Sequence, residues 1–381
     1  MIFSAIVSFG NGILNTFIGM YIIETTKSYL MFALTVILPN VMTISSKLWG
    51  ILSDYYGSRK IFIIIGAFSS SIIWLPLTFF LTPQGLVIIS SLGSALWSIG
   101  EPAFYAALIG EGSDKGKRMG LNNMAGVGML TLGSLISGYL YNILGGKFLV
   151  GFSALLFIVA TLYVALSYRE IIRQRISDKS FMEYLRESFS FTLIKEPQLR
   201  VINMSIIIAD IASSSAYPIL WGLYYEKINY NRELYGIANA IVVGVASIVS
   251  PGLGYLVDRI GGYLSYILSQ AGAVPILWIY GSIENPLFMV ILLMIPLGLL
   301  KYVALYKLYT DICKEKAGDA IGTVNTMSRI ACLPGVYIAS LADIFGESLT
   351  LELLALIKIV SVLTALTCLR YRKSGENADI S

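Results

Sequence analysis

The sequence contains no histidine, only three cysteines, and charged residues at 13% of its 381 positions. The absence of histidine excludes imidazole as a metal ligand or a proton relay. The cysteines, Cys313, Cys332 and Cys368, show no paired spacing, so the sequence predicts neither a disulfide framework nor a zinc site. A membrane-embedded enzyme would need a nucleophile with a base or a metal cluster, and no such set with His or Cys occurs. We therefore expect no catalytic residue, no bound metal and no cofactor.

Apolar residues dominate instead. They make up 56% of the chain, and the mean hydropathy is +0.75, values that bilayer-embedded helices require and ordinary soluble domains do not reach. The sequence thus predicts an all-α integral membrane protein with twelve transmembrane helices. These apolar segments lie near 1–23, 30–52, 61–81, 85–109, 119–141, 148–168, 199–224, 233–257, 263–281, 285–311, 320–342 and 349–369.

Lys and Arg predict the orientation of these segments. They concentrate in the loops after even-numbered segments and in the C-terminal tail, whereas the loops after odd-numbered segments hold only Lys27, Lys147, Lys227 and Arg232. By the positive-inside rule, both termini and the central loop face the cytoplasm of a multi-pass cell-membrane protein. We expect membrane lipids and a small solute as partners, no nucleic acid, and a monomer.

A repeat divides the chain. The skeleton Gly-x3-Asp-x2-Gly at Gly50, Asp54 and Gly57 recurs 204 positions later (254 − 50) as Gly254, Asp258 and Gly261. A second echo, Gly-x2-Asn at 120–123 and 322–325, is displaced by 202 positions (322 − 120). Fixed displacements of about half the chain predict two related halves. We expect six-helix halves at 1–168 and 199–370, a cytoplasmic tail at 371–381, and a cytoplasmic linker at 169–198, in which an interfacial helix and an unstructured chain both remain open.

Helix chemistry explains the repeated residues. A carboxylate at a helix C-terminus meets the negative end of the helix dipole, so Asp54 and Asp258 each need a positive partner. Arg59 and Lys60 lie close to the first aspartate, and Arg259 follows the second. The glycines fit too, because Gly57 and Gly261 permit left-handed backbone at a tight reversal, while Gly50 and Gly254 permit close helix packing.

With these residues the chain resembles the major facilitator superfamily of secondary transporters, whose loop between helices two and three carries Gly-x-Leu-x-Asp-x-x-Gly-Arg-Lys. Here Ser58 is one extra residue before Arg59. The resemblance implies alternating access between two six-helix halves. It also implies a gating role for the repeat, in which Asp54 would meet the start of the eleventh segment at 320–323 and Asp258 the start of the fifth at 119–121. Two family patterns, an arginine in the fourth helix and a Gly-Pro pair in the fifth, are missing, which weakens drug efflux as an alternative.

Charged side chains inside the bilayer mark the candidate site, because each costs at least about 2.5–3.5 kcal/mol there. Lys307 is expected to pair locally with Asp311, and Lys358 to pair with Glu352 or to stabilise the fold. Other polar and aromatic side chains share helix faces with the remaining charges. The candidate substrate-binding or proton-coupling residues are Asn11, Asn15, Lys47, Trp97, Glu101, Tyr105, Asp210, Ser214, Tyr217, Trp221, Asn239, Lys301, Asn325 and Arg329.

These residues predict a secondary active transporter of a small polar or anionic organic solute, coupled to protons. Glu101 and Asp210 are the candidate proton carriers, since burial favours the protonated form of a carboxyl group. Arg329 and Lys301 are the candidate anchors for an anion. Efflux of drugs or other lipophilic compounds is the alternative within this class. A membrane sensor that binds a solute without moving it, or a membrane enzyme, is the alternative from another class.

Overall fold

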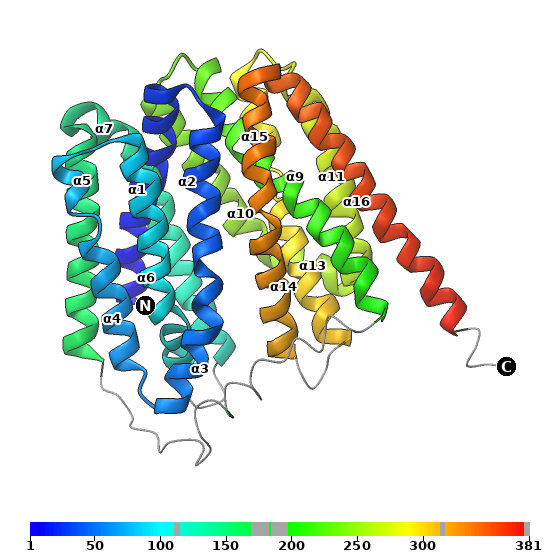
Figure 1. The fold of residues 1–381 in the computed structure, drawn as a ribbon, viewed down its shortest axis with the longest axis horizontal. Helices are drawn as coiled ribbons and strands as arrows, with labels where there is room; N and C mark the ends of the chain where they lie inside the picture. The colour runs from blue at the N-terminus through cyan, green and yellow to red at the C-terminus, as the bar shows by residue number, and fades with distance from the viewer. Residues whose placement is uncertain (110–114, 169–182, 184–196, 313–316, 377–381) are drawn as a thin grey trace. The chain divides into compact units, whose positions relative to one another are not determined.

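In a computed structural model the described residues are 1–109, 115–168, 183, 197–312 and 317–376 (Figure 1). Within these ranges every regular element is a helix. They are α1 (Ile2–Thr26), α2 (Tyr29–Met42), η1 (Thr43–Ser45), α3 (Ser46–Tyr56), α4 (Lys60–Ile72), α5 (Pro76–Phe79), α6 (Pro83–Ile109), α7 (Lys115–Ser167), α9 (Pro197–Lys227), α10 (Arg232–Ile260), α11 (Gly262–Tyr280), α12 (Pro286–Leu293), α13 (Leu297–Ile312), α14 (Ala317–Ala331), α15 (Leu333–Phe345) and α16 (Glu347–Glu376). The interfacial helix considered for the linker lies outside the described residues, apart from single positions at 183 and 197–198.

The all-α membrane fold predicted from composition is confirmed. Eleven helices of the described chain are long and apolar enough to cross a membrane, and one of them runs over 48 residues, Gly120–Ser167. That helix is interrupted at Gly145, whose φ of 76° and ψ of 165° are not helical. Because the interruption separates the predicted segments 119–141 and 148–168, these eleven helices accommodate the twelve predicted spans.

Four predicted spans consist of shorter helices joined end to end. Three of the junctions coincide with prolines, at Pro76 between α4 and α5, Pro296 between α12 and α13, and Pro334 at the start of α15. Proline lacks the backbone N–H that would continue the helical hydrogen bonds, and its ring clashes with the preceding turn. The fourth junction, between α2 and α3, is the short 3₁₀ helix η1.

Backbone contacts divide the chain into two compact units. Unit 1 comprises Met1–Phe189 and Ile228–Ser247, and unit 2 comprises Ser190–Lys227 and Ile248–Ser381. Helix α10 therefore begins in unit 1 and ends in unit 2. The division into halves at 1–168 and 199–370 remains a prediction.

In unit 1, α1 packs along α7 (Figure 1). A Cβ atom at Gly133 of α7 would overlap the carbonyl oxygen of Phe9, so the two backbones touch. Ser137 then donates to the carbonyl oxygen of Ile13 at 2.8 Å. In lipid the surroundings are as apolar as the helices, so no hydrophobic driving force brings helices together. Small residues that allow close packing and hydrogen bonds from side chain to backbone hold them together instead.

The start of α10 packs against α7 in the same way. A Cβ atom at Gly138 would overlap the carbonyl oxygen of Arg232, and one at Gly236 would lie 2.8 Å from that of Ser134. Asn239 also donates to the hydroxyl of Thr16 on α1 at 3.2 Å. Glycines on α7 and α10 thus hold α10 against α7, and the bond of Asn239 to Thr16 joins it to α1.

Unit 2 is built around α9, α11 and α16. The hydroxyl of Ser205 lies 2.9 Å from that of Tyr266 and 3.0 Å from that of Ser361, one residue from each helix. The hydroxyl of Ser205 also donates to the carbonyl oxygen of Ser361 at 2.8 Å, and the hydroxyl of Ser361 donates to the carbonyl oxygen of Ser205 at 2.9 Å. All three side chains are fully buried, so polar bonds fix these three helices to one another.

Candidate functional site

The two most deeply buried charges of the predicted site form an ion pair in unit 2. Asp210 on α9 accepts a hydrogen bond through Oδ1 from Nζ of Lys301 on α13. Their side chains are only 4% and 5% exposed. A charge removed from water is tolerated when an opposite charge meets it, and the pair supplies that compensation. The sequence identified both residues but not that they are partners.

The pair is incompletely satisfied. Oδ2 of Asp210 is buried and accepts no hydrogen bond from the described residues. On the other side, Nζ of Lys301 lies 4.5 Å from the ring centroid of Tyr302, within the range of a cation–π interaction. The carboxylate therefore keeps one free oxygen, whereas the ammonium group is held by both a carboxylate and an aromatic ring.

Lys358 on α16 is a third buried charge in this unit. Its Nζ donates to Oγ of Ser213 and to Oε1 of Gln270, each at 2.6 Å, instead of pairing with Glu352 as considered from the sequence. The side chain is 3% exposed. Ser213 follows Asp210 by three residues on α9, so the two lysines approach the same turn of that helix.

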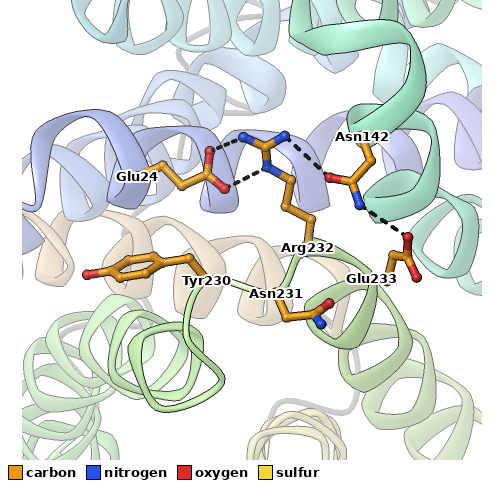
Figure 2. A pocket seen from close by; sticks show the side chains of 6 residues that line it. All are labelled: Glu24, Asn142, Tyr230, Asn231, Arg232 and Glu233. Carbon is orange, nitrogen blue, oxygen red and sulfur yellow. Dashed lines mark hydrogen bonds and ion pairs between the residues drawn. The ribbon is translucent and has the colours of Figure 1, made fainter.

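Unit 1 contains a separate polar cluster that the sequence did not predict. Arg232, at the start of α10, donates through Nε and NH2 to the two carboxylate oxygens of Glu24 near the end of α1, at 2.7 and 2.8 Å (Figure 2). The guanidinium carbon lies 3.8 Å from the ring centroid of Tyr141, whose hydroxyl donates to Glu24 at 3.1 Å. Two parallel bonds make this a fork-to-fork pair, the strongest geometry available to arginine and a carboxylate.

The cluster continues to a second carboxylate. NH1 of Arg232 donates to Asn142 at 3.3 Å, and the amide nitrogen of Asn142 donates to Glu233 at 3.2 Å (Figure 2). These side chains line a pocket of about 500 Å³ together with Tyr230 and Asn231. Because Glu24 and Arg232 are 208 positions apart and lie at helix ends, the sequence offered only their opposite charges as a signal.

The other predicted residues are distributed over both units. Asn239 bonds Thr16, Asn325 accepts a bond from Tyr306 at 3.4 Å, and Trp97 stacks on Phe3 with ring centroids 5.9 Å apart. Trp221 is buried beside Tyr217, with ring centroids 6.5 Å apart. Trp97, Asn239 and Asn325 are partly exposed despite these contacts. The other predicted residues with partly or largely exposed side chains are Asn11, Asn15, Lys47, Glu101, Tyr105, Ser214, Tyr217 and Arg329.

The first copy of the repeated motif has the local structure its residues predict. Gly57 ends α3 in the left-handed conformation, with φ 64° and ψ 14°. Asp54 lies 4.0 Å from Arg59, which also donates to the carbonyl oxygen of Ala106 at 2.8 Å. A Cβ atom at Gly50 would lie 3.2 Å from Pro102, so α3 and α6 approach closely there.

The second copy differs in its partners. Gly261 has the expected positive φ of 87°, but a Cβ atom at Gly254 would meet no described atom within 4 Å. Asp258 pairs with Lys307 at 3.2 Å, and Lys307 also reaches Asp311 at 3.7 Å, the local pair expected from their spacing. The side chains of 320–323, predicted to meet Asp54, lie outside the described residues, and the contact between Asp258 and 119–121 remains a prediction.

No group of three or more Cys, Asp and Glu side chains in the described ranges could hold a metal ion. What the geometry offers instead is a buried ion pair with a free carboxylate oxygen and a polar pocket beside an Arg–Glu pair. Both arrangements present charged and polar groups that could bind a solute or an ion, and neither positions a nucleophile.

Comparison with known proteins places the chain in a family. The family model described as Major Facilitator Superfamily matches residues 1–336. An uncharacterized MFS-type transporter, MJ1560 of Methanocaldococcus jannaschii, is 25% identical over 319 residues, covering 82% of this chain and 81% of that protein. The fold is similar to crystal structures of the nucleoside transporter NupG, a point mutant (TM-score 0.82; 96% of this chain and 99% of that one) and a second structure (0.78; 97% and 98%), each at 13% identity. The chain therefore belongs to the Major Facilitator Superfamily and is a multi-pass membrane transporter.

Proposed function

We propose that the protein is a proton-coupled secondary transporter of a small polar or anionic organic solute that works by alternating access. The observation that carries this proposal is the buried pair of Asp210 and Lys301, in which one carboxylate oxygen remains free. Ionisable side chains in spanning helices are costly and usually lie on substrate or proton pathways. A structural ion pair would be expected to satisfy both carboxylate oxygens.

The free oxygen suggests how a proton would act. A proton that binds Oδ2 of Asp210 forms an O–H bond and leaves a neutral carboxylic acid. The Coulomb attraction that holds Lys301 is then lost, and its ammonium group becomes available to an anionic group of the solute. Loss of the proton from Asp210 restores the carboxylate and draws Lys301 back. Proton uptake and solute binding would thus depend on the same pair of side chains.

Two further charges extend the proposal. Arg329, on α14 of the same unit, is a second anchor for an anion, because a guanidinium group binds carboxylates and phosphates in a planar, two-bond geometry. Glu101 on α6 in unit 1 is the second candidate proton carrier. Tyr217 and Trp221 would provide amphipathic walls beside the solute.

The polar cluster of unit 1 suits the alternating-access part of the proposal. The predicted orientation places Glu24 and Arg232 on the non-cytoplasmic side, since both lie next to loops that follow odd-numbered segments. Their pair, together with the glycine contacts of α7 and α10, would close that side of the transport path. Opening would require the start of α10 to leave α1 and α7.

The solute has to be found before coupling can be tested. Thermal unfolding of the purified protein, measured across sugars, organic acids, amino acids, peptides and lipophilic cations, would find it, because a ligand at one hundred times its Kd stabilises by about 2.7 kcal/mol. Nucleosides belong in this panel because NupG, whose fold is similar, is a nucleoside transporter. Stabilisation only by lipophilic cations would favour drug efflux over the proposed solute class.

Flux of the stabilising compound into proteoliposomes then tests the function. We expect accumulation driven by an imposed pH gradient, and acidification or alkalinisation of the lumen when the solute gradient is imposed instead. Accumulation that ignores the pH gradient would refute proton coupling. Binding without net movement would identify a sensor, and chemical conversion would identify an enzyme.

A further inference from the structure

The carboxylate of Asp210 lies in a cluster with two buried lysines, and the transport proposal uses only one of them. Lys358 is as deeply buried as Asp210, with each residue 3% exposed. Both partners of its ammonium group, Ser213 and Gln270, are neutral. Within the described ranges no carboxylate forms an ion pair with Lys358. A buried cation without an anionic partner is costly, so its presence in a spanning helix calls for a function.

The hydrogen-bonding capacities of Lys358 and Asp210 complement each other. An ammonium group has three N–H donors, and Lys358 uses two of them. Oδ2 of Asp210, in the same unit, is a buried acceptor that has no hydrogen-bond partner among the described residues. The cluster therefore contains one unused donor and one unused acceptor of opposite charge, although each alone is unfavourable in a nonpolar interior.

The positions of the side chains make an exchange of partners feasible. Ser213 accepts from Lys358 and itself donates to the carbonyl oxygen of Ala209, so its hydroxyl fixes the lysine beside the turn of α9 that carries Asp210. The lysine side chain has a flexible four-carbon stem and a compact charge, which allows it to change acceptors with small backbone movement. Asp210 and Lys301 are both close enough to Lys358 to act on it electrostatically.

We propose that Lys358 is the alternate partner of Asp210, whose Oδ2 it binds whenever Lys301 is drawn away. This proposal rests on the proposed function and completes it. In the interval after Asp210 releases its proton and before Lys301 leaves the solute and returns, the carboxylate needs another cation nearby. Lys358 supplies that cation, so that no step of the cycle leaves a bare carboxylate in the bilayer. Lys358 is thus a positioning residue for the coupling step.

A test by thermal unfolding of the purified full-length protein does not depend on transport. Lys301→Met and Lys358→Met each remove one ammonium group and keep the length of the side chain. Each single variant leaves Asp210 with the other lysine, so each should lower Tm moderately. The double variant leaves the carboxylate without a cation, and its Tm should fall by several degrees more than the sum of the single effects. In an Asp210→Asn background, the two substitutions should become additive.

Lys307→Met is the matched control. Lys307 lies on the same helix as Lys301, six residues further on, but it is 30% exposed and pairs with Asp258 and Asp311. Its combination with Lys358→Met should be additive. Additivity of Lys301→Met with Lys358→Met in the presence of Asp210 would overturn the proposal and leave Lys358 as a donor to Ser213 and Gln270.

The outcome remains decisive even if the double variant does not fold. Recovery of folded protein in the triple variant with Asp210→Asn would support the proposal, because the penalty then comes from the carboxylate. Failure of that triple variant to fold would overturn it. Flux measurements test proton coupling separately, so a protein that shows the predicted non-additivity but ignores the pH gradient would refute the proposed function alone.

Discussion

Replacing Glu24 by glutamine should weaken the attachment of α10 to α1. Glu24 and Arg232 form two bonds of 2.7 and 2.8 Å, and their side chains are 15% and 31% exposed. Charges about 4 Å apart attract by about 4 kcal/mol at an effective dielectric constant of 20, and partial exposure reduces this. Hydrogen bonds to charged groups contribute a net of about 1.5–3 kcal/mol. We expect Glu24→Gln to cost about 2 kcal/mol, which corresponds to about a 30-fold change in a two-state equilibrium.

Distances between spin labels would measure this change. Labels at Thr25 on α1 and Leu234 on α10, both exposed, report the separation of the two helices in a background with the native cysteines replaced. Glu24→Gln should add a population at longer distance, and Glu24→Arg should enlarge it by placing two like charges together. The reversed pair, Glu24→Arg with Arg232→Glu, should restore the short distance.

Glu233→Gln is the control for this experiment. Glu233 is the next residue after Arg232 and is exposed, and its carboxylate accepts a hydrogen bond from Asn142 at 3.2 Å. Its replacement should leave the distances unchanged. If Glu24→Gln and the parent protein give the same distance distribution, the Arg–Glu pair does not hold the two helices together, and the proposed closure of the non-cytoplasmic side is wrong.

Three further predictions address the ion pair of Asp210 and Lys301, the contact between α7 and α10, and the proposed role of Arg329. Asp210→Asn should abolish accumulation driven by a pH gradient but retain solute exchange; unchanged accumulation would remove Asp210 as the proton carrier. Gly138→Ala should destabilise the protein by about 1–3 kcal/mol, because its methyl group would overlap the backbone of Arg232, whereas Gly128→Ala, with open space around it, should be neutral or stabilising in the same unfolding assay. Arg329→Gln should weaken solute binding in titrations and leave Tm nearly unchanged. A large fall in Tm with unchanged solute affinity would make Arg329 structural.

The membrane fold was predictable because it depends on local properties. The length of the apolar segments and the positive φ at Gly57 both follow from residues close together in the chain. The helix junctions at Pro296 and Pro334 were equally local, but segment hydropathy does not detect them. The linker helix considered at 169–198 and the division into halves remain predictions.

The partners within the site were less predictable. Asp210 and Lys301 stood out as charges inside spans, but they are 91 positions apart, and a helical face does not reveal which helix it meets. Lys301 and Arg329 were equally candidate anchors for an anion on sequence grounds, and Lys301 is the one that pairs with Asp210. Glu24 was missed because a carboxylate near a helix end resembles an ordinary loop charge.

The junction at Pro296 gives Asp210 and Lys301 unequal freedom. Asp210 belongs to α9, which the buried hydroxyls of Ser205, Tyr266 and Ser361 join to α11 and α16, so its backbone is braced on several sides. Lys301 begins the second turn of a helix that starts immediately after a proline break. A tilt of α13 at this break would therefore move Lys301 relative to Asp210 and change the strength of their attraction, and the backbone contact between α13 and α11 at Gly262 would limit how far that tilt can go.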